Sequence, residues 1–315
     1  MRTHGIHPWR LLVGALVVAG TVWVSAGPLS PPLGPVSPTM KPLDQVEPRT
    51  VIRAADLPLT ISQPGSYYLV GHITAIGGGI TINADNVTID FMGFTLTGGT
   101  GSGVAVTGLH TNITLRNGTV RGWDDRGINA GTGRHVRVMN MNVSNNDTEG
   151  LAVGDGSIVR DSIVHNNMGD GICALDDTMI INCVVTENQG NGIFTGSGCT
   201  VKDCVVSNNT GDGIVLIDNC RIVNNTCDGN GETNGAGIHT TALRSRIEGN
   251  HVTGSARGFD IDGTDNLIIR NTAAGNDTNY SIAVNNPHGP LVAVSGAADI
   301  SGVAGSTHPW ANFDY

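Results

Sequence analysis

The most constraining feature of this sequence is a glycine that precedes an apolar residue and recurs every 21 to 24 residues. A period in the low twenties indicates a solenoid, in which one coil cannot bury its own apolar face and neighbouring coils must stack. A leucine-rich repeat would need a leucine framework and a helical segment in each repeat, and neither is present. The apolar residues after the recurring glycines are Ile80, Val104, Ile128, Leu151, Ile172, Ile193, Ile214, Ile238 and Phe259.

Each repeat carries three short apolar stretches with the period-two alternation of β-strands. The strands that begin at the residues just given are called the Gly-Ile wall below. The second stretch aligns Ile89, Leu115, Val138, Val159, Ile180, Val201, Ile222, Ile247 and Ile268, and the third aligns Val120, Val143, Val164, Val185, Val206, Cys227, Val252 and Ala273. Three stacked walls predict an all-β fold, a single-stranded right-handed parallel β-helix (a solenoid) of about nine coils.

Asparagine and aspartate form two further columns. Such side chains tolerate left-handed backbone and bond to neighbouring main chain, so both columns predict tight turns repeated from coil to coil. The column between the second and third stretches contains Asn117, Asn140, Asp161, Asn182, Asp203 and Asn224. The column before the glycine corner contains Asn167, Asn188, Asn209 and Asn230. The 45 glycines therefore have a positional explanation, since many lie at coil corners.

The chain has six cysteines, and four of them align one coil apart. Stacking of Cys183 on Cys204 and of Cys199 on Cys220 would bring their Cα atoms within disulfide range. We expect small buried thiols rather than disulfides, because in-register parallel neighbours aim their Cβ atoms in the same direction. No Cys-x-x-Cys is present, so a structural zinc site is not expected.

The ends of the chain differ in composition from the repeat. A positive start, an apolar run and a small-residue cleavage site indicate a signal peptide, so we expect an exported protein that is secreted, on the cell surface or periplasmic, with no membrane span after cleavage. A formal charge of −10 argues against nucleic acid as a partner. The expected organisation is a signal peptide (1–26), a proline-rich linker (27–56), an N-terminal cap (57–76), the β-helix (77–281) and a C-terminal cap or tail (282–315).

The coil pattern resembles that of the parallel β-helix (pectin-lyase-like) repeat proteins, from residue 77 to about 276. It appears best in the coil Gly171-Ile172 … Ile180-Ile181-Asn182-Cys183-Val184-Val185-Thr186-Glu187-Asn188 … Asn191-Gly192. The resemblance implies the fold but leaves function open, because this scaffold carries lyases, hydrolases, epimerases, tailspikes and adhesins. It also implies that the outer face of the Gly-Ile wall is the usual substrate face.

Strand parity places Asp260 and Asp262 on that outer face about 7 Å apart, with His239 one coil away and Arg257 at the preceding turn. Two carboxylates at this separation suit the acid and base of an inverting glycosidase. In a lyase, carboxylates would instead hold Ca²⁺ and an arginine or lysine would be the base. We predict Asp260, Asp262 and His239 as catalytic and Arg257 as substrate-binding; the alternative is that the aspartates are ordinary solvated residues.

Four further residues are candidates for substrate binding, namely Asp218, Phe194, Asp176 and Asp177. The Asp176-Asp177 pair matches one motif of polygalacturonase-like hydrolases. Their Gly-His-Gly motif is missing, as are the arginine motifs of pectate lyases and the Asp-Pro-His-Glu of alginate epimerases, so no family catalytic set carries over. An outward apolar stripe indicates a covered surface, either by the tail or by self-association. Its members are Cys173, Leu175, Phe194, Val215 and Ile217.

We therefore predict an exported β-helix protein that binds or processes polysaccharide, as a lyase or hydrolase does, on the outer face of the Gly-Ile wall. No cofactor is required in this hypothesis, and Ca²⁺ is the one candidate ion. The alternative is a non-catalytic structural or adhesion protein of the cell surface or envelope, with the apolar stripe as its interface.

Overall fold

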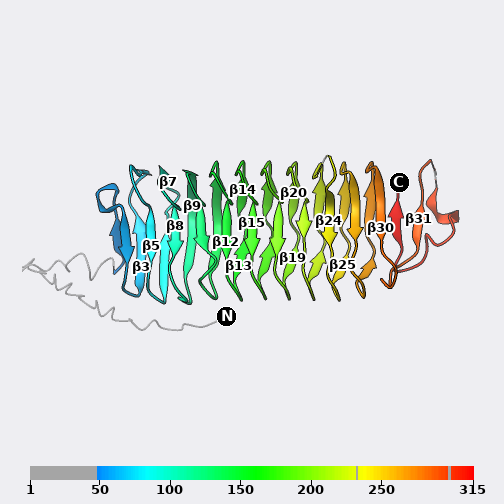
Figure 1. Cartoon of the computed structure of the whole chain (residues 1–315), viewed down its shortest axis with the longest axis horizontal. Helices are drawn as coiled ribbons and strands as arrows, with labels where there is room; N and C mark the ends of the chain where they lie inside the picture. The colour runs from blue at the N-terminus through cyan, green and yellow to red at the C-terminus, as the bar shows by residue number, and fades with distance from the viewer. Residues whose placement is uncertain (1–47, 232, 297–298) are drawn as a thin grey trace, which may run out of the picture. The chain divides into compact units, whose positions relative to one another are not determined.

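The computed structural model describes residues 48–231, 233–296 and 299–315. The predicted signal peptide and the predicted linker up to residue 47 lie outside the described residues. The described chain is a β-solenoid whose coils stack along one axis, from β3 to β31 in Figure 1. All of its strand pairings are parallel, which confirms the parallel β-helix. Two short 3₁₀ helices are also present, at Ala54–Asp56 and Ile300–Gly302.

The Gly-Ile wall is an eleven-stranded sheet in which each strand pairs with its counterpart in the next coil. Its strands are β2 (Leu59–Ile61), β5 (Ile80–Ile82), β8 (Val104–Val106), β10 (Ile128–Ala130), β12 (Leu151–Val153), β15 (Ile172–Ala174), β18 (Ile193–Thr195), β21 (Ile214–Val215), β24 (Ala236–Thr240), β27 (Arg257–Ile261) and β30 (Thr278–Ile282).

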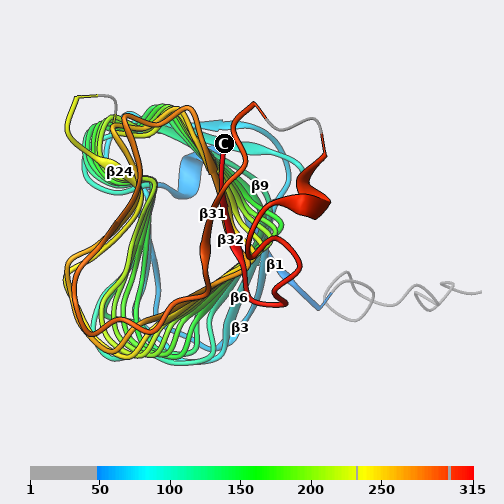
Figure 2. The same ribbon diagram turned by 90° about the vertical axis from the view of Figure 1, so that its right-hand side faces the viewer.

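The other two predicted walls belong to one sheet of 21 strands. Figure 2 looks along the stack and shows β24 of the Gly-Ile wall on the left and β9 of the larger sheet on the right. The strands are β1 (Thr50–Ile52), β3 (Gly65–Leu69), β4 (Ile73–Thr74), β6 (Val87–Asp90), β7 (Thr95–Gly99), β9 (Thr114–Trp123), β11 (Arg137–Ser144), β13 (Ile158–Arg160), β14 (Ile163–His165), β16 (Met179–Ile181), β17 (Val184–Thr186), β19 (Thr200–Lys202), β20 (Val205–Ser207), β22 (Arg221–Val223), β23 (Thr226–Asp228), β25 (Arg246–Glu248), β26 (His251–Thr253), β28 (Leu267–Ile269), β29 (Thr272–Ala274), β31 (Leu291–Ala293) and β32 (Asn312–Asp314).

Two details of the fold differ from the prediction. The second and third walls are continuous because β9 and β11 run through the asparagine bend without a break. The Gly-Ile wall has eleven strands rather than about nine, because β2 and β30 add a coil at each end. Neither coil carries the glycine signature, since Pro58 and Asn279 stand where the other coils have glycine. The segment expected to be a cap, 57–76, forms strands that pair with the coil that follows.

The predicted inward columns form the core. Every residue of the second and third columns is buried, and so is every residue that follows a recurring glycine. The corner glycines are needed for close packing between coils. A Cβ atom at Gly192, for example, would lie 2.3 Å from Cγ1 of Val206 and 2.7 Å from the carbonyl oxygen of Gly213. Such contacts are shorter than van der Waals distance, so alanine cannot replace glycine there without moving the next coil.

The asparagine and aspartate columns have distinct structural roles. The residues between the second and third walls all have positive φ, from 52° at Asn140 to 62° at Asn117, as predicted for a repeated tight turn. The column before the glycine corner forms a buried ladder instead. In it, Oδ1 of Asn188 accepts hydrogen bonds from the backbone and side-chain N–H groups of Asn167, at 3.1 and 2.9 Å. Each rung therefore satisfies polar groups that the core would otherwise leave unpaired.

A second buried ladder, which the sequence did not reveal, holds the C-terminal tail. It runs through Asn225, Asn250 and Asn271 and ends at Asn312 of β32. Asn312 is fully buried, and its Oδ1 accepts from the backbone N–H of Asn271 at 3.0 Å. Strand β32 pairs with β29 on one side and with β31 on the other. The tail thus continues the 21-stranded sheet by supplying the next rung.

The C-terminal tail does not pair with the wall that contains the predicted apolar stripe. Leu175 and Ile217 are 43% and 36% exposed, while Cys173, Phe194 and Val215 are half-buried. The prediction that the tail covers this stripe is wrong, because the tail pairs with the other sheet. The six cysteines are all free thiols, as expected, and all but Cys173 are buried.

Candidate functional site

Three of the predicted residues come together on the outer face of the Gly-Ile wall. His239 of β24 and Asp260 of β27 are direct partners in the parallel register, and Asp262 follows β27 two residues after Asp260. Period-two alternation aims all three side chains away from the core, whereas Ile238, Phe259 and Ile261 point into it. One ligand atom from each of the three lies within 4.8 Å of those of the other two.

The imidazole of His239 is held in place by a carboxylate that the sequence analysis did not single out. Oδ2 of Asp212 lies 2.8 Å from Nδ1 of His239, and Oδ1 of the same carboxylate accepts the backbone N–H of Ala236 at 2.6 Å. Because a carboxylate only accepts, Nδ1 of His239 carries the proton and Nε2 is the basic nitrogen of the neutral ring.

The contact between His239 and Asp212 shifts the pKa of both side chains. The hydrogen bond to Asp212 raises the pKa of His239 above its ordinary value, and partial burial opposes this effect. Burial acts to raise the pKa of Asp212, but the hydrogen bond with His239 and the backbone N–H of Ala236 outweigh it, so the net shift is downward. Asp212 is therefore ionised over the range in which His239 titrates.

The free nitrogen of His239 faces the two aspartates. Nε2 lies 3.9 Å from Oδ2 of Asp262, beyond hydrogen-bond distance, and it has no hydrogen-bond partner among the described residues. The side chain of Asp262 is 60% exposed, whereas Asp260 is 3% exposed as a residue. Asp260 is buried because Arg257 lies against it, with Nε 2.7 Å from Oδ2. The cluster thus combines an oriented base, an accessible carboxylate and a buried, neutralised one.

The cluster does not fit a calcium site. Calcium takes six to eight oxygen ligands. Here the described residues offer two carboxylates and an imidazole, and Arg257 already neutralises one of the carboxylates. A calcium ion is therefore not assigned to this cluster.

The other predicted binding residues, except Arg257, lie outside the cluster and serve local structure. Oδ1 of Asp218 accepts the backbone N–H of Leu243 at 2.7 Å, and Oδ1 of Asp176 accepts that of Ser197 at 2.8 Å. Asp177 adopts a left-handed conformation with φ of 56°. Phe194 is half-buried on β18, three strands from the strand of Asp260. The structure does not bring these four residues to His239.

The same wall carries a groove nearer the N-terminus. Two adjoining hollows of about 270 Å³ each share Gly131, Thr132 and Leu175. The groove exists because the outward positions there are small, as at Gly131 and Ala152. Arg126 lines one edge and is held by a bidentate ion pair with Glu149, at 2.9 and 3.0 Å. The Gly-Ile wall therefore combines a polar cluster with a groove whose lining arginines are both ion-paired.

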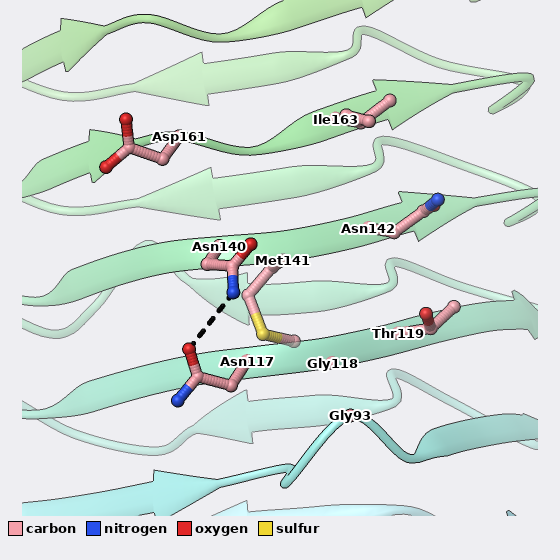
Figure 3. A pocket seen from close by; sticks show the side chains of 9 residues that line it. All are labelled: Gly93, Asn117, Gly118, Thr119, Asn140, Met141, Asn142, Asp161 and Ile163. Carbon is pink, nitrogen blue, oxygen red and sulfur yellow. Dashed lines mark hydrogen bonds between the residues drawn. The ribbon is translucent and has the colours of Figure 1, made fainter.

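A larger hollow, of about 400 Å³, lies on the 21-stranded sheet and is a different kind of feature (Figure 3). It follows the bend of the asparagine column, where Nδ2 of Asn140 donates to Oδ1 of Asn117 at 3.2 Å. Its one ionisable side chain is that of Asp161. The hollow offers hydrogen-bonding amides but no acid–base pair, so the cluster on the Gly-Ile wall is the stronger candidate site.

Asp212 could have been found from its place in the repeat. It occupies the corner position before Gly213, in register with Asp170 and Asn191 of the preceding coils. The next residue of that column is Ala236. Because alanine has no polar side chain to occupy the second oxygen, Asp212 is left to bind His239. A polar corner residue that is followed by alanine in the next coil could therefore have indicated that Asp212 binds another side chain.

These features define a parallel β-helix protein with an imidazole–carboxylate cluster on the outer face of one wall. The right-handed β-helix region family matches residues 72–199, 102–245 and 176–295, which together cover more than half of the chain. The chain belongs to this family. No curated protein matches it significantly in sequence. Within residues 48–231, 233–296 and 299–315, no helix is both long and apolar enough to cross a membrane.

The solved structures that are similar in fold include two enzyme modules. The A-module of mannuronan C-5 epimerase AlgE6 from Azotobacter vinelandii has a TM-score of 0.54 and 14% identity, over 76% of this chain and 86% of that one. The A-module of mannuronan C-5 epimerase AlgE4 from the same organism has a TM-score of 0.52 and 16% identity, over 76% and 88%. At such identities the likeness concerns the fold alone.

Proposed function

We propose that this protein binds and processes a polysaccharide on the outer face of the Gly-Ile wall, with His239 as the proton-transfer group. The observation that carries the proposal is the hydrogen bond between Asp212 and His239, which leaves Nε2 basic and facing Asp262. The groove on the same wall supports a long substrate, since a polymer that lies along the stack would meet both features. Export by the predicted signal peptide is part of the proposal.

The chemistry requires a base and a group that completes the proton transfer. Nε2 of His239 accepts a proton from a sugar carbon next to a carboxylate, as in a lyase, or from water, as in a hydrolase. The resulting imidazolium is stabilised by the carboxylate of Asp212. In both cases the glycosidic C–O bond breaks, and Asp262, exposed beside Nε2, acts in its protonated form and donates the proton that the leaving oxygen takes up. Arg257 and buried Asp260 form the rigid floor of the site.

The test is turnover on a panel of glycans. We would incubate the protein with polymannuronate, polyguluronate, polygalacturonate and neutral glucans, and follow reducing ends, unsaturated uronate and the proton spectra of the polymers. Uronates are included because the two similar modules are named as mannuronan epimerases. We expect product from at least one polymer and a large loss in Asp262→Asn. Absence of product from every polymer would contradict the proposal and favour the non-catalytic surface protein.

Replacement of Asp212 is expected to change the pH dependence of the site. The hydrogen bond from His239 to Asp212 is the largest cause that raises the pKa of the ring. In Asp212→Asn that charge is lost, so the pKa of His239 falls and the rising limb of kcat/KM, which needs the neutral ring, moves to lower pH. An NMR titration of the His239 ring measures the same shift without any substrate.

The matched control for this variant is Asp218→Asn, which removes a carboxylate from the turn after β21 that binds the backbone of Leu243 and not His239. The His239 titration should be unchanged in this control. If Asp212→Asn also left the titration unchanged, the hydrogen bond could not be what sets the basicity of the ring.

A further inference from the structure

A further concave site lies at the C-terminal end of the stack, on the 21-stranded sheet rather than the Gly-Ile wall. A hollow of about 370 Å³ is formed where the tail folds against β28. Its lining is largely apolar and includes an indole and two imidazoles. The lining residues are Leu267, Ile269, Pro287, His288, Gly289, His308 and Trp310. This volume is within the range of small-ligand sites.

The indole at this hollow is both exposed and held in place. Trp310 is 42% exposed, which is unusual for the largest apolar side chain when nothing covers it. The guanidinium of Arg270 lies over the ring, with Cζ 5.2 Å from the ring centroid. Arg270 is itself fixed, since Nε donates to the carbonyl oxygen of Pro309 at 2.9 Å and Nη1 to Glu248 at 3.0 Å. The ring is therefore a preorganised surface, and a ligand that packs on it loses little entropy of ordering.

The two imidazoles at the rim present opposite hydrogen-bonding groups. Nδ1 of His288 lies 2.9 Å from the carbonyl oxygen of Gly289, which only accepts, so Nδ1 carries the proton and Nε2 accepts. Nδ1 of His308 accepts the backbone N–H of Trp310 at 3.2 Å, so in the neutral ring Nε2 carries the proton and donates. Neither Nε2 atom has a hydrogen-bond partner among the described residues.

We propose that this hollow binds one sugar ring of a glycan, at a site separate from the cluster of His239. A pyranose has an apolar face of C–H groups, which suits the indole, and hydroxyls that both donate and accept, which suit the pair of imidazoles. A purely apolar ligand would leave both Nε2 atoms without partners and would cost their desolvation. The site would hold a polymer without acting on it.

The test uses tryptophan fluorescence and titration calorimetry with four probes: tetramannuronate, tetragalacturonate, cellotetraose and mannotetraose. We expect at least one probe to cause a saturable change. Trp310→Ala should weaken its binding about tenfold or more, since the stacked surface is lost, while Trp310→Phe should retain part of the affinity. The matched control is Tyr315→Ala, which removes another exposed aromatic of the tail that stacks on His251 and does not line the hollow.

The result can be separated from that of the proposed function. Binding at the hollow should persist in His239→Ala, and turnover of a short substrate should persist in Trp310→Ala. The inference is overturned if no probe binds, if Trp310→Ala binds as the wild type does, or if Tyr315→Ala loses affinity to the same extent. Thermal unfolding of each variant shows whether the tail is still in place.

Discussion

Under the proposed function, replacing His239 with alanine is expected to lower kcat by about 10²- to 10⁴-fold, the usual contribution of a positioned general base. The loss should fall on kcat more than on KM, because the ring transfers a proton and contributes little to binding a long polymer. Its side chain is 25% exposed at the surface of the wall, so its removal should not disturb the core. Initial rates and a far-UV spectrum of the variant measure the two effects.

His110 provides the control for this experiment. Its Nδ1 lies 3.2 Å from Asp85, which makes it another imidazole–carboxylate pair of the described chain, but its Nε2 is occupied by Asn83 at 2.9 Å. With both nitrogens in use, it cannot act as a base. His110→Ala should therefore retain activity. Equal losses in the two variants would mean that the effect comes through the fold, and an active His239→Ala would exclude His239 as the base.

The second large effect is expected in the core. Asn188→Ala should reduce the free energy of unfolding by about 3–5 kcal/mol, since several buried groups lose their partners at once and each costs about 1–3 kcal/mol. Oδ1 of Asn188 accepts two hydrogen bonds from Asn167, and its Nδ2 donates to Asn209 and to the carbonyl oxygens of Val164 and Thr186. Urea denaturation followed by circular dichroism measures the change.

The neighbouring amide gives the matched comparison. Gln189 is exposed and contributes only its backbone N–H, which donates to Asn167. Gln189→Ala should change the free energy of unfolding by less than about 0.5 kcal/mol. A small loss in Asn188→Ala would show that water replaces the missing amide inside the stack, and the ladder would then be dispensable for stability.

The fold was predictable because its signal is repeated in every coil. Period-two alternation and the corner glycines fixed the inward columns, and all of them are buried. The predicted number of coils was too low because the terminal coils lack the glycine signal. The last coil has Asn279 at its corner instead of glycine, and β30 of this coil is the last strand of that wall among the described residues. The ladder of Asn271 and Asn312 was missed because the two residues are 41 positions apart, well outside the repeat period.

For the site, strand parity and coil register correctly predicted that His239, Asp260 and Asp262 lie together. They did not predict the charged groups that pair with these residues. Asp260 was expected on an open face and is instead buried under Arg257. The long side chain of Arg257 extends over the wall as far as the carboxylate of Asp260, three residues later in the chain. The hydrogen bond from His239 to Asp212 was missed because the next residue of the Asp212 column, Ala236, has no polar side chain. Both contacts join residues of different columns. The sequence analysis considered each column separately and could not predict them.

The tail rung of Asn312 also limits how far the stack can grow. A solenoid end is an unpaired strand edge, and a second molecule could add to it as further coils do, giving an open filament. Here β32 and the carboxamide of Asn312 fill the hydrogen-bonding positions of β29 and Asn271. At this end of the stack the outermost strands are then β31 of the 21-stranded sheet and β30 of the Gly-Ile wall. The tail therefore occupies the edge of β29 that a strand of a second molecule would otherwise pair with.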